Sequence, residues 1–166
     1  LSTAKISKIS NSYTGTGANG PSFYPSISKN GDFIAFESEA TNLDVNGTSN
    51  GTRQIYLFKH TLGAGIGSIS QITNGNKTSF GASIDGKAEK IVFTTHATNI
   101  PLTSFTSDTN KFSDVVLWTN GKFYLAGRTQ MGIFPEGGAS KGAVISLDSS
   151  TIAFESNASN MVTGKG

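Results

Sequence analysis

A ten-residue segment that occurs three times constrains this chain more than any other feature of its sequence. The copies read IAFESEATNL, IVFTTHATNI and IAFESNASNM, and they begin at Ile34, Ile91 and Ile152, 57 and 61 residues apart. An isoleucine also lies seven residues before each copy, at Ile27, Ile84 and Ile145. Self-similarity at a spacing near 60 residues is typical of β-repeat architectures such as the blades of a propeller.

The segments around these copies alternate apolar and polar residues and are separated by turn residues, which predicts short β-strands. Asn30-Gly31 and Asn120-Gly121 are strong hairpin signals. No amphipathic helix is predicted anywhere. We expect strands at residues 4–10, 26–28, 33–37, 54–59, 68–73, 83–84, 90–94, 114–119, 122–126, 143–146 and 151–155.

This strand order predicts an all-β fold of propeller-type blades, each with four antiparallel strands. Residues 25–75 and 82–127 form two complete blades, 1–24 supply the outer strand of a preceding blade and a loop, and 143–166 form the inner half of a further blade. A circular propeller has at least four blades, so this chain is not expected to close a ring alone. Its open strand edges are expected to recruit strands from other chains, giving a homo-oligomeric ring or a filament.

Composition excludes several classes of function. The chain has no cysteine, so disulfides, thiol nucleophiles and cysteine–zinc sites are absent. Charged residues make up 14%, the net charge is +2 and no basic cluster occurs, which argues against nucleic-acid binding. No apolar run is long enough to span a membrane. The low charge, the abundance of Thr, Ser, Asn and Gly, and a start at Leu1 favour a processed, exported bacterial protein, extracellular or periplasmic.

The repeat resembles the TolB-type propeller repeat, also called PD40 and treated as WD40-like. The residues that carry the resemblance are Pro25-Ser-Ile-Ser-x-x-Gly31-x-x-Ile34-Ala-Phe-Glu-Ser38, Ala40-Thr-Asn-Leu43, Ile55-Tyr-Leu-Phe58 and Asp108-Thr-Asn-x-x-Ser-Asp114-Val-Val. The resemblance implies a propeller fold and includes partner-binding propellers of the periplasm, propellers attached to peptidases and surface proteins. In Gly86-Lys-Ala-Glu89 the usual Asp-Gly pair is displaced, which leaves the geometry of the second hairpin turn open, though not the blade.

Repeated polar residues are interpreted as structural. Asn42, Asn99 and Asn160 each follow Thr or Ser at the end of a strand, where asparagine bonds nearby backbone. Glu37 and Glu155 could form a glycosidase pair, but equivalent residues on separate blades are more simply read as capping hydrogen bonds of their own blades. His60 and His96 lack partners at metal-binding spacing. We therefore predict no catalytic residue and no organic cofactor.

Calcium is the one metal that the sequence indicates. Asp108, Asn110 and Asp114 supply oxygen ligands at suitable spacing in one loop, and the loop Asp44–Asn50 supplies fewer. Asx-turns, in which the same side chains bond local backbone, are the alternative for both loops.

Aromatic residues in or near loops are candidates for contact with a protein partner or a glycan, or for packing between blades. They are Tyr13, Phe23, Tyr24, Phe105, Phe112 and Phe134. The sequence thus favours a non-enzymatic binding or assembly protein that acts through loop surfaces or edge-strand self-association. The alternatives are a fragment or accessory propeller of a larger hydrolase or peptidase, and a glycan-binding propeller.

Overall fold

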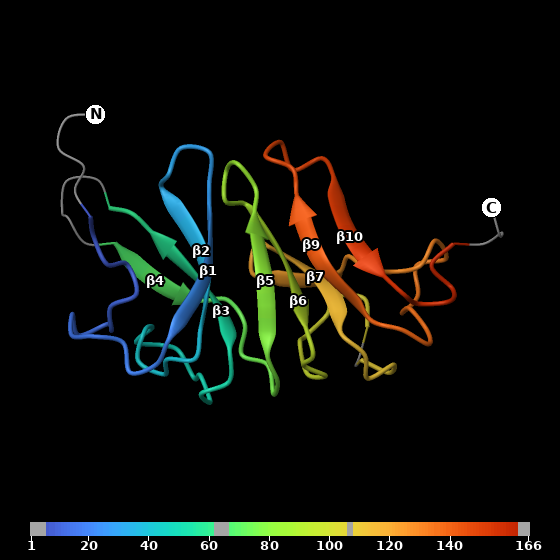
Figure 1. Ribbon diagram of the computed structural model, residues 1–166, viewed down its shortest axis with the longest axis horizontal. Helices are drawn as coiled ribbons and strands as arrows, with labels where there is room; N and C mark the ends of the chain where they lie inside the picture. The colour runs from blue at the N-terminus through green and yellow to red at the C-terminus, as the bar shows by residue number, and fades with distance from the viewer. Residues whose placement is uncertain (1–5, 62–66, 106–107, 163–166) are drawn as a thin grey trace.

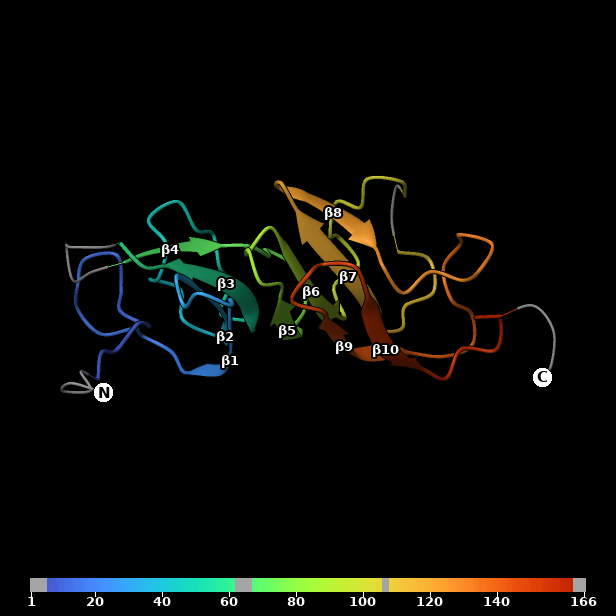
Figure 2. The ribbon, with the colours of Figure 1, turned by 90° about the horizontal axis from the view of Figure 1, so that it is seen from above.

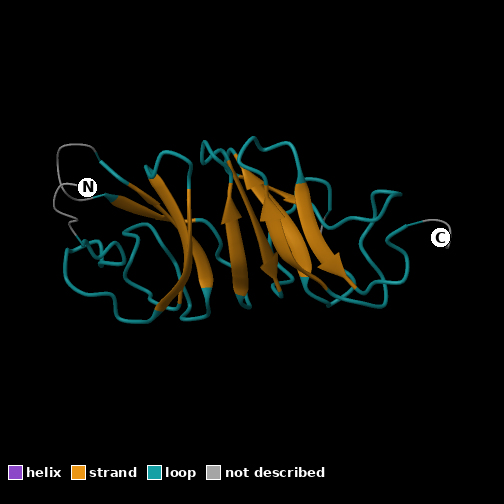
Figure 3. Ribbon diagram, turned by 45° about the horizontal axis from the view of Figure 1, so that its top comes forward, coloured by secondary structure: helices purple, strands orange, loops and turns teal. Residues whose placement is uncertain are grey.

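All regular secondary structure in the described part of the chain is β-strand. The computed structural model describes residues 6–61, 67–105 and 108–162, and within them every element is a strand (Figure 3). No helix long and apolar enough to cross a membrane occurs in these ranges. The predicted all-β class is confirmed.

The ten strands form three antiparallel sheets that follow the chain in order. The first blade contains β1 (Ser22–Ile27), β2 (Phe33–Ser38), β3 (Gln54–Lys59) and β4 (Ser68–Gln71). The second blade contains β5 (Ser79–Ile84), β6 (Lys90–Thr95), β7 (Asp114–Thr119) and β8 (Lys122–Leu125). The half-blade contains β9 (Ser140–Ile145) and β10 (Ile152–Ser156). Four-stranded antiparallel meanders of this kind are propeller-type blades.

The three sheets stand side by side in one row, as Figures 1 and 2 show. Strand β5 packs against β1 and β2, and β9 packs against β5 and β6. The row does not close into a ring, and the first blade and the half-blade lie at opposite ends of the long axis (Figure 1). Each end of the row therefore presents one open side of a sheet.

The hairpin that joins the first two strands of each sheet is built in the same way three times. The side chains of Ser28, Asp85 and Ser146 accept hydrogen bonds at 3.1, 3.2 and 3.0 Å from the backbone N–H five residues further on. Each turn places one residue in the left-handed region, with φ of +80° at Gly31, +60° at Ala88 and +64° at Ser149. The turn at Gly86–Glu89, whose geometry the displaced Asp-Gly pair left open, is therefore built like the other two, because Ala88 takes the conformation that glycine takes in the first blade.

The first strand of each sheet contains a bulge. The register with the second strand shifts after Phe23 in β1, after Phe80 in β5 and between Ala153 and Glu155 on the β10 side of the half-blade. Beyond each bulge the strand continues, so β1, β5 and β9 begin three to four residues before the predicted starts. The bulge interrupts the period-two pattern from which those starts were predicted.

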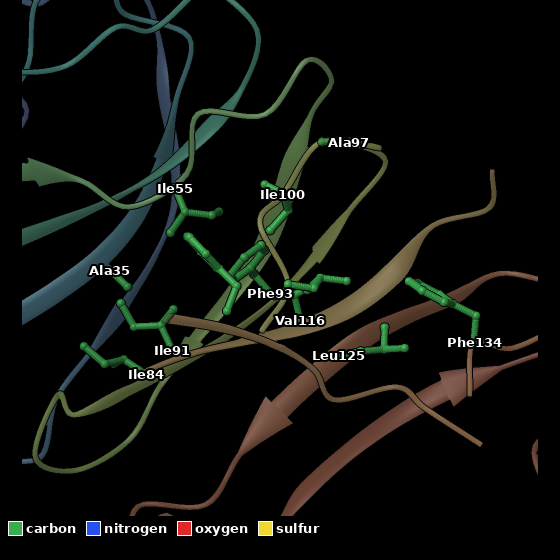
Figure 4. Packing of buried hydrophobic residues seen from close by; sticks show 12 residues of the cluster. Ala35, Ile55, Ile84, Ile91, Phe93, Ala97, Ile100, Val116, Leu125 and Phe134 are labelled. Carbon is green, nitrogen blue, oxygen red and sulfur yellow. The ribbon is translucent and has the colours of Figure 1, made fainter. Parts of the chain in front are cut away.

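The largest cluster of buried apolar side chains joins the two complete blades and the loop before the half-blade (Figure 4). Ala35 and Ile55 come from the first blade, Phe93 and Val116 come from the second, and Phe134 comes from the connection to β9. A smaller cluster, which includes Val92 and Val115, packs against the half-blade. The two complete blades thus share one core, and the half-blade is held to the second blade by a separate cluster.

The predicted strand at residues 4–10 is wrong in its described part. Residues 6–10 form no strand, and residues 4 and 5 lie outside the described residues. A strand needs a neighbour to accept its backbone hydrogen bonds, and the described chain offers residues 6–10 no such neighbour. Ile9 instead packs loosely against the buried cluster of the first blade.

Candidate interaction surfaces

Neighbouring sheets are joined at their hairpin turns by a hydrogen bond that recurs along the row. The Lys29 N–H donates to the Gly86 carbonyl at 3.2 Å, and the Gly86 N–H donates to the Leu147 carbonyl at 2.9 Å. These three residues occupy the same place in successive copies of the repeat. Each turn therefore donates to the turn that follows it.

A second hydrogen bond recurs between the first strands. Ser26 Oγ accepts the Ile84 N–H at 3.2 Å, and Ser83 Oγ accepts the Ile145 N–H at 3.2 Å. Here too the acceptor lies in one copy and the donor in the next. The contact between sheets consequently has a direction along the chain.

A third contact joins the first blade to the second through a carboxylate. Glu37 Oε1 accepts the Gly81 N–H at 2.7 Å, and Glu37 Oε2 lies 3.4 Å from Arg53 Nη1. Burial raises the pKa of Glu37, while the Gly81 N–H and Arg53 act in the opposite direction. Glu37 was expected to cap hydrogen bonds of its own blade. It bonds Arg53 of that blade, and it also accepts the Gly81 N–H of the next blade, which was not expected.

The N-terminal end of the row leaves one side of this contact uncovered. Ile27 is 59% exposed, whereas the equivalent Ile84 and Ile145 are 3% and 8% exposed. The latter two are covered by the sheet that precedes them. We call Tyr24, Ile27 and Lys29, which surround this uncovered position, the N-terminal open face.

The opposite side of the contact is uncovered at the other end of the row. Glu155 occupies the position of Glu37 and is exposed, whereas Glu37 is 1% exposed. Val144 occupies the position of Ser26 and Ser83, and it is exposed too. We call Val144, Leu147 and Glu155 the C-terminal open face.

Strand β10 has a free edge in the part of the chain that the structure describes. In the complete blades the second strand pairs with a third, β2 with β3 and β6 with β7. The half-blade ends at β10, which pairs with β9 alone. Beside β10 lies a groove of about 290 Å³ that is lined by Ser104, Phe105, Leu117, Tyr124, Leu125, Ala126, Arg128 and Ile152.

The repeated asparagines tie together the two ends of each inner hairpin. Asn42 Oδ1 accepts the Asn19 N–H at 3.0 Å, Asn99 Oδ1 accepts the Asn76 N–H at 2.8 Å, and Asn160 Oδ1 accepts the Glu136 N–H at 2.8 Å. The structural interpretation of the three asparagines is correct, but their partners lie 23 or 24 residues away rather than nearby. We call each of these contacts an asparagine clasp.

The loop proposed for calcium brings its three predicted ligands together. Asn110 Nδ2 lies 3.3 Å from Asp114 Oδ1, and Asp108 Oδ1 accepts the Asn110 N–H at 2.9 Å, which is an Asx-turn. Asp108 Oδ2 is buried and makes no hydrogen bond within the described ranges. No group of three or more His, Asp or Glu side chains that could hold a metal occurs in those ranges. Calcium binding by Asp108, Asn110 and Asp114 stays a prediction.

Asp114 is the most strongly perturbed group of this loop. Its side chain is almost fully buried at the start of β7. Burial, and then the nearby charge of Asp108, raise the pKa of Asp114 to about 7, although Asn110 acts in the opposite direction. In the first blade β3 begins with the neutral Gln54, whose amide bonds Gly75 and Thr73.

The six aromatic candidates do not form one patch. Ring contacts join Phe23 to Tyr24 at 6.2 Å and Phe105 to Phe134 at 4.6 Å. Phe134 is buried in the main core and Phe105 packs against that core, so packing accounts for these two. Tyr13, Tyr24 and Phe112 are exposed and Phe23 is half-buried, so these four stay candidates for a partner surface.

Sequence reasoning missed the unusual backbone of Tyr24. It has φ of +46°, in the left-handed region that bulky side chains rarely adopt. Gly81 and Gly142 occupy the same position in the other copies, with φ of +66° and +65°. Aligning the three copies would have revealed a tyrosine where the repeat otherwise has glycine. The strained residue lies on the N-terminal open face.

The remaining candidates for catalysis lie apart. His60 and His96 are exposed on different blades, and His96 packs against the Phe80 ring at 5.5 Å. Glu37 is buried and paired with Arg53, and the second blade lies between Glu37 and Glu155. Glu37 and Glu155 are therefore not brought together as a carboxylate pair for glycoside hydrolysis.

Comparison with known proteins finds likeness among solved structures. No family model matches the sequence, and no curated protein matches it. A crystal structure of TolB from Acinetobacter baumannii is similar at a TM-score of 0.46 and 19% sequence identity, over 84% of this chain and 27% of that chain. The chain thus spans about a quarter of the length of that protein.

Proposed function

We propose that this chain is a non-enzymatic binding and assembly protein that is exported from the cell. It binds a protein partner whose strands pair with β10 and complete the half-blade. The observation that carries this proposal is the free edge of β10 beside a groove of mixed polar and apolar lining. An open edge offers unpaired backbone donors and acceptors, and an added strand satisfies them while side chains give selectivity. Low charge and a surface rich in Thr, Ser and Asn support the exported location.

The complete blades indicate which kind of segment fits. Strand β7 pairs with β6 through Val92 and Leu117, Phe93 and Val116, and Thr94 and Val115. Ala153, Phe154 and Glu155 are the corresponding residues of β10. A third strand should therefore pair antiparallel with β10 and present aliphatic residues opposite Ala153, Phe154 and Glu155.

The groove adds the requirement for a large apolar side chain. Between the two complete blades, Leu57 of β3 packs in the main core together with Trp118 of β7 and Phe123 of β8. Beside β10 the wall corresponding to Leu57 is Leu117, and no third strand of the described chain fills the space. The expected ligand is a β-hairpin with an aromatic residue near its turn, as in the hairpin of β7 and β8.

A labelled peptide with the sequence of residues 113–126 tests this proposal. We expect the peptide to bind the intact protein, with a rise in fluorescence anisotropy that saturates. A matched peptide with proline in place of Val116 should bind at least about tenfold more weakly, because proline removes a ladder donor in the middle of the strand. Equal binding of the two peptides, or no binding of either, would overturn the proposal.

Glycan binding is a second candidate, favoured by the exposed Tyr24 ring stacked on Phe23. Planar aromatic faces present an apolar surface beside polar groups, which suits a sugar ring. A glycan array should then give signals that are lost in Tyr24→Ala and kept in Tyr13→Ala, a change of an equally exposed tyrosine elsewhere. Identical array profiles for both variants and the parent would exclude this candidate.

A further inference from the structure

We propose that copies of this chain stack head to tail, with the C-terminal open face of one copy against the N-terminal open face of the next. The contact would repeat the one that each sheet already makes with the sheet that follows it. It uses the faces of the row rather than the edge of β10, so it does not depend on strand addition at that edge. The occupant of each open face is therefore a second copy of this chain.

The first argument is the carboxylate contact. Glu37 reaches across the sheet boundary to the N–H of Gly81, the bulge residue of the next first strand. Glu155 is the equivalent carboxylate at the end of the row, and Tyr24 is the equivalent bulge residue at its start. In the stack, the Glu155 carboxylate accepts the Tyr24 N–H of the next copy. Tyr24 already holds the left-handed backbone that Gly81 uses to present its N–H.

The second argument is the bond between turns. The Lys29 N–H donates to the Gly86 carbonyl, and the Gly86 N–H donates to the Leu147 carbonyl. In this series the Lys29 carbonyl remains as an acceptor at the start of the row, and the Leu147 N–H remains as a donor at its end. In the stack, the Leu147 N–H donates to the Lys29 carbonyl of the next copy. The two ends of the series thus match in position and in chemistry.

The third argument is the apolar match of the two faces. Ile27 and Tyr24 are exposed on one face, and Val144 and Leu147 are exposed on the other. Inside the molecule the position of Ile27 is covered at each boundary, and a serine stands where Val144 stands. In the stack, Val144 replaces that serine's hydrogen bond by contact with Ile27 of the next copy. Exposed aliphatic residues placed at both halves of a known contact indicate an interface.

The two faces are different surfaces, so the contact is heterologous. Each copy keeps one free face after pairing, and further copies add until the rotation per copy closes a ring or produces a filament. An isologous dimer, in which like faces meet, is not compatible with the direction of the three contacts. This difference makes the proposal separable from other forms of self-association.

Light scattering coupled to size-exclusion chromatography tests the proposal with two variants that damage opposite faces. Ile27→Asp damages the N-terminal open face and Glu155→Lys damages the C-terminal open face. We expect the parent chain to exceed 17.3 kDa in mass and to grow with concentration. Each variant alone should elute at 17.3 kDa, with a self-association constant at least about tenfold weaker. Val45→Asp places the same charge at an equally exposed aliphatic residue outside both faces and should behave as the parent.

A mixture of the two variants gives the decisive result. Ile27→Asp keeps an intact C-terminal open face and Glu155→Lys keeps an intact N-terminal open face, so together they should form one capped pair of twice 17.3 kDa. A mixture that stays at the monomer mass, a parent chain that stays at 17.3 kDa, or an assembly that survives both substitutions would each overturn the proposal. Binding of the hairpin peptide is measured on the monomeric Ile27→Asp variant, whose β10 is unchanged, so failure of stacking and failure of strand addition are told apart.

Discussion

Glu37 accepts a hydrogen bond of 2.7 Å from the N–H of Gly81, and these two residues belong to different blades. The carboxylate is buried and has Arg53 as its counter-ion. A single side chain therefore connects β2 of the first blade to β5 of the second blade and helps to fix how the two blades pack. Loss of this contact should weaken the boundary between the blades.

Replacing Glu37 by alanine is expected to lower the free energy of unfolding by about 2 to 4 kcal/mol. The change leaves the Gly81 N–H and the Arg53 guanidinium without their buried partner. Urea denaturation followed by circular dichroism measures the loss. Glu155→Ala makes the same change at the exposed equivalent position and should cost less than about 0.5 kcal/mol at concentrations where the chain is monomeric. Equal losses in the two variants would contradict the assigned role of Glu37.

Replacing Thr94 by valine is expected to stabilise the protein by about 1 kcal/mol. Thr94 stands in the second blade where Glu37 stands in the first, and its buried hydroxyl makes no hydrogen bond among the described residues. Valine has nearly the same shape and removes the cost of burying that hydroxyl. The neighbouring Thr95→Val is the control and should destabilise, because Thr95 Oγ1 bonds Ser79 and the Ala97 N–H. Thermal denaturation with opposite shifts of the two midpoints is the expected result.

Stability should fall as the pH rises from about 4 to 7, and Asp114 should be the cause. The folded protein holds a proton on Asp114 up to a pKa of about 7, whereas the unfolded chain releases it near the ordinary value of 3.8. The folded state therefore binds more protons in this range, so the free energy of unfolding decreases with pH, by up to roughly 4 kcal/mol. Urea titrations at several pH values measure the slope, and Asp114→Asn should remove most of it.

Asp148 provides the matched control for this titration. Hydrogen bonds from Ser146 and then Ser150 lower the pKa of Asp148 to about 2, which lies outside the range of interest. Asp148→Asn should therefore leave the slope between pH 4 and 7 unchanged.

The same titrations with millimolar calcium test the predicted metal site: bound calcium would favour the charged form of Asp114 and raise stability at pH 8. Identical curves with and without calcium would argue against that site.

Replacing Asn99 by alanine should cost about 1 kcal/mol, since it removes the acceptor for the Asn76 N–H in the middle clasp. Hydrogen exchange should also accelerate at the Asn76 amide. Asn157 is an exposed asparagine in the third copy, and Asn157→Ala should change stability by less than about 0.5 kcal/mol. An Asn76 amide that exchanges at the parent rate in Asn99→Ala would show that the clasp contributes little.

The repeat made most of the fold predictable from the sequence. Strands β3 and β7 begin and end where alternation predicted, at Gln54–Lys59 and Asp114–Thr119, because both lie inside a sheet and have no irregularity. Strands β1 and β5 were predicted too short, because a bulge breaks the alternation that defines them. The segment at residues 6–10 has the alternating pattern of a strand but no neighbouring strand to pair with in the described chain. An alternating pattern alone does not show whether such a neighbour exists.

The interaction surfaces were harder to predict for a related reason. The free edge of β10 follows from the order of the strands and was expected. The direction of the contact between blades was not, because it depends on the side from which Glu37 leaves β2 and on which N–H the bulge at Gly81 presents. The repeat shows that Glu37 and Glu155 occupy equivalent positions, but only the three-dimensional structure shows that Glu37 is covered and Glu155 is exposed.

The asparagine clasps have a consequence for how such chains change in length. Each clasp joins the residues just before and just after an inner hairpin, so both ends of that hairpin are fixed by residues of the same repeat. A duplication or deletion of one whole repeat would leave every clasp intact and would recreate the same boundary with the next repeat. Gene duplication can therefore lengthen the row one blade at a time, and each intermediate would inherit the geometry of its neighbours.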